Sequence, residues 1–243
     1  DANAIYTDHA YCFSCETYSM LEDREPQQPA NTNLIDGEVN ALTKRGISLE
    51  TVKFWDYRIG NYKGQPVQIA NYKNSKGQTI GQKLRFANKD FLYLGDSKDI
   101  GLYGQHLWRS AGKMVTITEG EVDALSISQC FNNRWPVVSL PQGCASAKKA
   151  ISKSIEWLEQ FDSVVLAFDS DPQGVKAAHE AALLLSPGKA KIVSFPSGYK
   201  DANDMLKANQ QKALLDAIWG AKSFRPDGIL AGVDLWDMVT SKD

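Results

Sequence analysis

The chain has 243 residues, of which 43% are hydrophobic and 23% are charged, and its formal net charge is −2. This composition is that of a globular protein with one large or two small domains, and no apolar run reaches the roughly 20 residues of a membrane-spanning helix. The polar first residues give no sign of a signal peptide, and four cysteines are too few for a disulfide scaffold. We therefore expect a cytoplasmic protein that binds no membrane.

The charges are unevenly distributed along the chain. Residues 1–33 carry six acidic residues and one basic residue, whereas residues 34–111 carry twelve basic and seven acidic residues. The remainder is nearly balanced. A basic segment of this kind fits contacts with nucleic acid, although chance clustering on a solvated surface explains the same pattern.

Cys12 and Cys15 form a C-x₂-C pair flanked by aromatic residues. Such a pair is half of a tetrahedral zinc site, and a structural site needs four ligands. The other two cysteines lie far along the chain, and His9 has poor spacing for a third ligand. We therefore expect residues 1–25 to be the remnant of a zinc ribbon without a complete zinc site. A hairpin that never binds metal is the alternative.

A proline-containing, charged linker is expected at residues 26–33, and a smaller α+β subdomain at residues 34–111. Its second helix should be N-capped by Ser48, and a turn at residues 74–77 should join its last two strands. The expected helices lie near residues 41–42 and at residues 48–55, and the expected strands at residues 57–59, 66–72 and 79–86.

Lys83, Arg85 and Lys89 follow one another closely near the last of these strands, and Phe86 and Phe91 are interleaved with them. Cations among aromatic rings suit contacts with phosphates and bases. A sheet edge protected by lysines shows the same pattern. The residues alone do not separate these two interpretations.

From residue 112 the pattern changes to alternating strands and helices, which predicts a mainly parallel, doubly wound sheet in an α/β subdomain spanning residues 112–227. The expected strands lie at residues 114–118, 136–140, 164–169 and 190–195. The helix after the first strand is expected to begin near residue 119, and the helix after the second strand to end near residue 160. The third helix should span residues 175–185, and one last helix should run to about residue 221.

Residues 164–171 form an unbroken apolar run that ends in Asp169 and Asp171. Such a run suits a strand buried on both faces, which places both carboxylates at the strand's carboxyl end, where open α/β sheets bind ligands. At this spacing the two side chains point to one side. They repel each other unless a cation such as Mg²⁺ neutralises them. An ordinary acidic helix cap is the alternative.

The same topology should bring Glu119, the loop around Gly143 and Asp201 to this edge of the sheet. Beyond the α/β subdomain, residues 228–243 are expected to begin a connection to another domain. The chain has no Walker A motif, and no histidine lies in a context that suits a Ser-His-Asp hydrolase.

The run Glu-Gly-Glu-Val-Asp-Ala at residues 119–124, followed by Asp-Ser-Asp at residues 169–171, resembles the Toprim domain of DNA primases, topoisomerases and some nucleases. Other segments resemble the primase half of the T-odd phage primase–helicases, and residues 9–15 are similar to the second half of that family's template-reading zinc ribbon. The loop at residues 141–144 departs from the family's usual glycine-rich form. The resemblance spans nearly the whole chain and rests on residues 82–85, 104–108, 138–140, 145–149 and 200–203.

This resemblance implies a DNA primase, which makes short RNA primers on single-stranded DNA at the replication fork by nucleotidyl transfer. It implies a metal site formed by Glu119, Asp169, Asp171 and Asp201, and lysines that hold a triphosphate, Lys83 and Lys89. Asp123 is expected to orient a loop, or an ion through water. The residues implied to touch nucleotide or template are Arg85, His106, Lys148, Lys200 and Asn203.

The implied cofactor is Mg²⁺ or Mn²⁺, and Zn²⁺ belongs only to a longer protein with the missing cysteine pair. The implied partners are single-stranded DNA, ribonucleoside triphosphates, a helicase domain fused at the C-terminus and a replicative DNA polymerase. A phage-encoded protein would act in the cytoplasm of its bacterial host. The alternatives are a Toprim nuclease and a degenerate primase-like module that binds single-stranded DNA beside a helicase.

Overall fold

The computed structural model describes residues 33–95, 100–109 and 111–225, together with the backbone of three short N-terminal strands. The chain forms two compact units, residues 1–33 and 34–243. In the first unit, three strands pair antiparallel in the order β1-β2-β3. Their bounds are β1 (Asn3–Ile5), β2 (His9–Cys12) and β3 (Thr17–Met20). Cys12 ends β2, whereas Cys15 lies outside the described residues.

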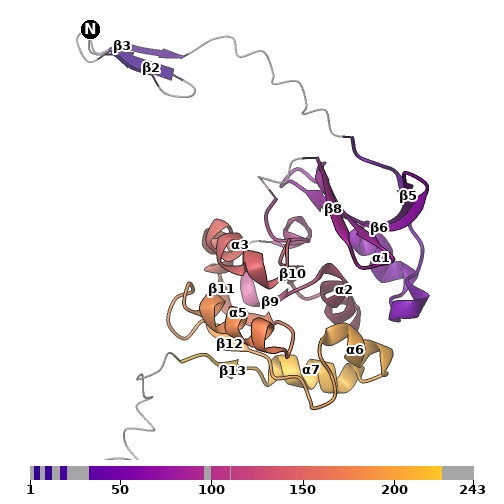
Figure 1. The fold of residues 1–243 in the computed structure, drawn as a ribbon. Helices are drawn as coiled ribbons and strands as arrows, with labels where there is room; N and C mark the ends of the chain where they lie inside the picture. Colours follow the sequence, from indigo (N-terminus) through magenta and orange to yellow (C-terminus); the bar gives the residue numbers. More distant parts are fainter. Residues whose placement is uncertain are drawn as a thin grey trace, which may run out of the picture. The chain divides into compact units, whose positions relative to one another are not determined.

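The second unit begins with an antiparallel sheet in the order β4-β5-β6-β7-β8 (Figure 1). Helix α1 precedes β5 and is capped by Ser48, whose hydroxyl accepts from the Thr51 amide at 3.3 Å, as expected. The β7–β8 hairpin turns at Lys89, whose φ is 72°. The elements of this region are β4 (Gly37–Glu38), η1 (Thr43–Arg45), α1 (Leu49–Trp55), β5 (Tyr57–Tyr62), β6 (Gln65–Lys73), β7 (Thr79–Phe86), β8 (Phe91–Gly95) and η2 (Gln105–Leu107).

A second sheet has the order β10-β9-β11-β12-β13. Its first four strands are parallel, and β13 pairs antiparallel at the edge. The elements are β9 (Gly112–Thr118), α2 (Glu121–Cys130), β10 (Val137–Ser139), η3 (Cys144–Ser146), α3 (Ala147–Lys153), α4 (Ile155–Leu158), β11 (Phe161–Ala167), α5 (Pro172–Ala182), β12 (Ala190–Ile192), α6 (Ala202–Lys207), α7 (Gln211–Trp219) and β13 (Lys222–Ser223).

Helices cover both faces of the parallel sheet, which confirms the expected doubly wound α/β architecture (Figure 1). On the central strand β11, Val165 and Ala167 belong to a core shared with α2, α6, α7 and the antiparallel sheet. Val164 and Leu166 face a second core with α3, α4 and α5. Full burial on both faces explains why this strand is an unbroken apolar run.

The structure corrects three expected elements. The expected last helix is two helices, because Asn209 adopts a left-handed backbone (φ 58°) and the Gln210 amide bonds back to the Met205 carbonyl at 2.9 Å. Similarly, the helix expected to end near residue 160 is interrupted at Ser154. The first expected short helix is the 3₁₀ turn η1, which ends at a left-handed Gly46. Strand β8 was not anticipated.

No helix among the described residues combines the length and the apolar character needed to cross a membrane. The predicted connection at residues 228–243 lies outside the described residues.

Candidate functional site

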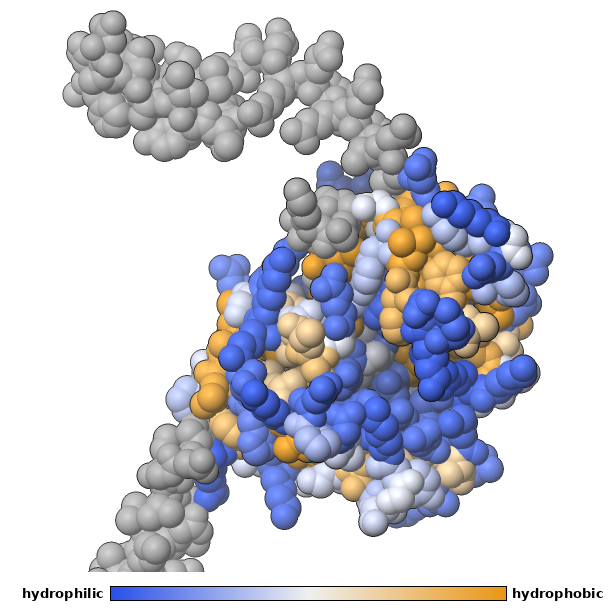
Figure 2. Space-filling view, in the orientation of Figure 1, coloured by the Kyte–Doolittle hydropathy of each residue, from blue (hydrophilic) through white to orange (hydrophobic). Residues whose placement is uncertain are grey.

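The carboxyl ends of β9 and β11 open onto a cavity of about 570 Å³ between the two sheets. Both carboxylates and cations line the cavity, and the cations include side chains from η1 and from the β7–β8 hairpin. Figure 2 shows hydrophilic side chains over the middle of this face and apolar ones over strands β5–β8. The acidic lining residues are Glu119, Glu121, Asp123, Asp169 and Asp201, and the basic ones are Arg45, Lys83, Arg85, Lys89 and Lys200.

Three of these carboxylates, those of Asp123, Asp169 and Asp201, form a cluster in which one oxygen of each lies within 4.8 Å of the others. Burial and then the Asp201 carboxylate raise the pKa of Asp123 well above its usual range. Burial, followed by the nearby Glu119 carboxylate, raises the pKa of Asp169 to about 6. Crowded carboxylates with raised pKa values are the arrangement that a bound cation relieves.

Glu119 follows β9 and lines the same cavity. Its Oε2 atom is buried and has no hydrogen-bond partner among the described residues, which is costly for a carboxylate unless a ligand satisfies it. The loop opposite is tight at Gly143, whose φ of 62° and ψ of −160° is a conformation essentially restricted to glycine. A Cβ there would lie 3.4 Å from Glu119 Oε1. The unsatisfied oxygen and the adjacent cluster fit a divalent cation held by oxygen ligands.

Asp171 has a different environment from Asp169. One of its oxygens caps α5 by accepting from the Gly174 amide at 2.9 Å, so the helix cap that the sequence left open as an alternative is present. That hydrogen bond and the Lys200 ammonium hold the pKa of Asp171 below its usual value. Lys200 Nζ lies 3.1 Å from an oxygen of Asp169 and 3.1 Å from an oxygen of Asp171. The ammonium therefore bridges the two carboxylates.

Lys83 of strand β7 makes a buried ion pair with Glu121, the first residue of helix α2. Its Nζ lies 2.8 Å and 3.1 Å from the two oxygens of Glu121 and donates to the Pro141 carbonyl at 2.9 Å. Tyr72 donates to Glu121 Oε1 at 2.6 Å, and Tyr93 donates to the Pro141 carbonyl. Because an ammonium has three protons, Lys83, which is only 7% exposed, has its hydrogen-bonding capacity filled within the protein.

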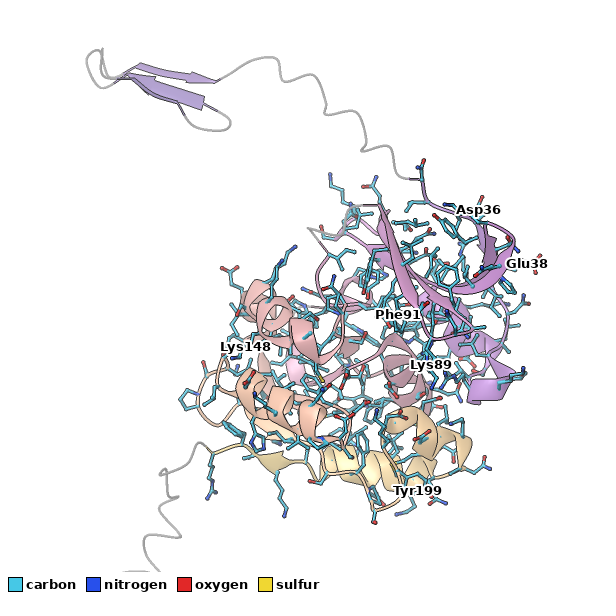
Figure 3. All side chains as sticks on the ribbon, viewed as in Figure 1. Asp36, Glu38, Lys89, Phe91, Lys148 and Tyr199 are labelled. Atoms are coloured by element: carbon cyan, nitrogen blue, oxygen red, sulfur yellow. The ribbon has the colours of Figure 1, made fainter. Side chains whose placement is uncertain are left out.

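Arg85, Lys89 and Phe91 form the open basic side of the cavity. Figure 3 places Lys89 and Phe91 close together in the second unit. Lys89 is exposed at the hairpin turn, and among the described residues it has no ion pair. Its ammonium is therefore available to a ligand, in contrast to that of Lys83.

Three other residues implied by the resemblance offer no free polar group to the cavity. His106 and Lys148 are not among its lining residues, and the side-chain amide of Asn203 is already hydrogen-bonded. His106 is half-buried, and burial and then Lys73 lower its pKa. Lys148 pairs with Glu180 at 3.2 Å, on the α3 side of Figure 3 away from Lys89. Asn203 lines the cavity but is 2% exposed.

The Asn203 amide has partners on both of its ends. Its Nδ2 donates to the Arg45 carbonyl and to Ser126 Oγ, each at 2.9 Å, and its Oδ1 accepts from Arg45 at 3.2 Å. The Asn203 backbone amide donates to Asp123 Oδ1 at 3.0 Å. The geometry therefore gives Asn203 the task of positioning Asp123 and Arg45.

Sequence reasoning did not assign Asp123 to the acidic cluster, or Arg45 and the Tyr72–Pro141–Tyr93 contacts to the site. The sequence does carry a signal for Asp123. It lies four residues after Glu119, a spacing of one helical turn, so both side chains should face the same edge of the parallel sheet. Arg45 had none, since its partner Asn203 is 158 residues away in the chain. The Pro141 carbonyl is a backbone group, whose role no residue pattern reveals.

Comparisons with known proteins agree with this architecture. The family described as "Bacteriophage T7 DNA helicase/primase, N-terminal a+b fold" matches residues 37–95, and the family described as "Toprim-like" matches residues 116–206. The DNA helicase/primase of Enterobacteria phage T3 is 35% identical over 264 residues, which are 100% of this chain and 46% of that protein. The chain thus spans about half the length of the T3 protein.

Two solved structures resemble the chain closely. The crystal structure of the primase fragment of the bacteriophage T7 primase–helicase has a TM-score of 0.75 and 34% identity, and the match covers 90% of this chain and 94% of that one. Primase domains that interact with the T7 lagging-strand DNA polymerase, bound to an RNA/DNA hybrid and dTTP, have a TM-score of 0.73 and 37% identity over 77% of this chain and 94% of that one. The chain belongs to the phage T7-type primase–helicase family, of which it comprises the primase region.

Proposed function

We propose that this chain is a DNA primase, which joins ribonucleotides into short RNA primers on single-stranded DNA. The observation that carries the proposal is the cavity itself, in which the Asp123–Asp169–Asp201 cluster faces the exposed cations of the β7–β8 hairpin. Carboxylates that hold a metal ion, placed opposite cations that hold phosphates, are the two halves of a nucleotidyl-transfer site. The related T7 primase domains are found in a complex of the lagging-strand DNA polymerase with an RNA/DNA hybrid and dTTP, which supports the same assignment.

In the proposed reaction, the 3′-hydroxyl oxygen of one ribonucleotide forms a bond to the α-phosphorus of the next. The bond between that phosphorus and the oxygen bridging it to the β-phosphate breaks, pyrophosphate leaves, and the hydroxyl proton passes to water. Lys89 and Arg85 neutralise the triphosphate and hold it for in-line attack, and this positioning supplies much of the rate. Lys83 stabilises this surface through its hydrogen bonds to Glu121 and to the Pro141 carbonyl.

We propose Mg²⁺ as the physiological ion, with Mn²⁺ as a substitute. Asp123, Asp169 and Asp201 would hold it, with Glu119 as a further ligand, and Asp171 would contribute only if Lys200 moved aside. When bound, the ion lowers the pKa of the attacking hydroxyl and offsets the charge that develops on the phosphorus. The unsatisfied Glu119 oxygen and the raised pKa values of Asp123 and Asp169 support this set.

The remaining roles are proposals that follow from family membership. The proposed partners are a helicase domain fused at the C-terminus and a replicative DNA polymerase. The T3 relative is named a DNA helicase/primase, and the related T7 primase domains interact with a DNA polymerase. Cys12 and Cys15 would complete a template-reading zinc ribbon with a second cysteine pair outside this chain. Lys200, 53% exposed by side chain, remains a candidate contact for nucleotide or template.

The test is primer synthesis on mixed single-stranded templates with four ribonucleotides and Mg²⁺, comparing the chain with its Asp169→Asn variant. We expect the variant to lose at least about a hundredfold in rate, because one carboxylate of the cluster no longer carries charge. The matched control is Asp162→Asn, an exposed residue near the opposite end of the same strand β11, which should be fully active. Equal synthesis by both variants, or Mg²⁺-dependent DNA cleavage without nucleotides, would contradict the assignment.

A further inference from the structure

Phe91 is an apolar ring exposed at a site that is otherwise charged. It is the first residue of β8, it is 50% exposed, and it lines the same cavity as the acidic cluster. The other large hydrophobic side chains that are exposed among the described residues lie elsewhere on the surface. A ring of this size left half in water forgoes apolar burial, so its position calls for a reason other than folding.

Cations from the neighbouring strand support this ring. Arg85 pairs with Phe91 across the β7–β8 ladder, and Lys83 pairs with Tyr93. Lys83 Nζ lies 4.6 Å from the Phe91 ring centroid and Arg85 Cζ lies 5.6 Å from it, which are cation–π distances. Lys83 is fixed by Glu121 and Pro141, so it supports the ring from a fixed point and does not compete for a ligand.

We propose that Phe91 is the platform on which the base of a bound ribonucleotide stacks, while Arg85 and Lys89 hold its phosphates. This rests on the proposed function and names the element of that site that binds the base. The ring, the two cations and the carboxylate cluster share one cavity, so one bound nucleotide can contact the ring with its base and the cations with its phosphates while its α-phosphorus lies near the carboxylates. Stacking tolerates every base because each has a π-face, so Phe91 contributes affinity and does not select a sequence.

The test separates the base from the phosphates. Binding of ATP, CTP and inorganic tripolyphosphate is measured by calorimetry in Mg²⁺ without template, so that no synthesis occurs. Phe91→Ala should weaken the binding of ATP and of CTP about tenfold each and leave the binding of tripolyphosphate unchanged. Phe91→Leu keeps the apolar volume without the π-face, so its nucleotide affinity should fall as much as that of Phe91→Ala. Phe91→Trp should bind ATP at least as tightly as the parent chain.

The matched control is Trp219→Ala, because Trp219 is also 50% exposed but lies outside the cavity, and nucleotide affinity should not change. In primer synthesis, Phe91→Leu should raise KM for ribonucleotides about tenfold and change kcat less than twofold. Equal losses for ATP and tripolyphosphate would overturn the proposal, because the ring would then act only by orienting cations. Unchanged ATP binding in Phe91→Leu would also overturn it. A parent chain that binds neither ligand would contradict the primase assignment together with the stacking role.

Discussion

Two lysine–carboxylate arrangements flank the same cavity, and they differ in exposure. On the side of the antiparallel sheet, Lys83 and Glu121 are buried, with 8% and 9% of their side chains exposed, and every ammonium proton has an acceptor. On the side of the parallel sheet, Lys200 is 53% exposed by side chain and bridges Asp169 and Asp171 from solvent.

From this difference we propose that the Lys83 ammonium is structural and that the Lys200 ammonium is replaceable. Removing one partner of a buried pair leaves an uncompensated charge in a medium of low dielectric constant. An exposed ammonium gives up its contacts at little cost, because water replaces them. Lys83 therefore fixes how the basic hairpin faces the acidic cluster, whereas Lys200 occupies a position that a metal ion or a phosphate can take over.

The largest expected effect comes from Lys83→Met. We expect it to lower the free energy of unfolding by about 3–5 kcal/mol, since Glu121 would remain buried without its counter-charge. Urea denaturation measures this loss. Lys200→Met is the control, and its cost should stay below about 1 kcal/mol. Equal costs for the two variants would show that burial does not distinguish the pairs.

The second expectation concerns pH and the carboxylates on the exposed side. Burial and the Glu119 carboxylate raise the pKa of Asp169 from 3.8 to about 6 in the folded chain, so between these values the folded state holds a proton that the unfolded state has lost. Stability must then fall as pH rises through this window. Between pH 4.5 and pH 7 the chain should lose about 2 kcal/mol relative to Asp169→Asn, measured by urea denaturation at both pH values. A constant difference would contradict the raised pKa.

A double replacement tests whether Lys83 and Glu121 stabilise the chain as a pair. Adding Glu121→Gln to Lys83→Met removes the stranded charge, so the double variant should recover about 1–3 kcal/mol of the stability lost by the single one. Nucleotide binding should remain impaired in both, because the Pro141 carbonyl and the hairpin lose their shared anchor. Strictly additive losses would show that Lys83 and Glu121 do not act as a pair.

The smallest expected effect is a gain in metal affinity. Lys200→Met removes the ammonium that competes for Asp169 and Asp171, so Mn²⁺ should bind about three- to tenfold more tightly, a range worth about 1 kcal/mol. Calorimetric titration of the parent chain and the variant measures the change. Weaker Mn²⁺ binding in the variant would show that Lys200 assists the ion.

The residues that the sequence could place are those whose position follows from one strand and the turn after it. Asp169 follows a doubly buried strand, and Glu119 follows another, so sheet topology alone brings them to one edge. Lys83 was identified as functional, but its buried pairing with Glu121 depends on how two subdomains pack. Likewise, Arg45 and the Pro141 carbonyl enter the site only through tertiary contacts, and Asn209 divides a helix through a backbone conformation that amphipathic periodicity does not reveal.

We propose that the carboxylate cluster binds the divalent ion that primer synthesis needs. A crystal of the chain grown with Mn²⁺ and ATP, examined by anomalous scattering at the manganese edge, tests it directly. We predict a manganese peak within coordination distance of Asp123, Asp169 and Asp201, lost in Asp169→Asn crystals. ATP bound in the cavity with no manganese at these carboxylates would contradict the claim.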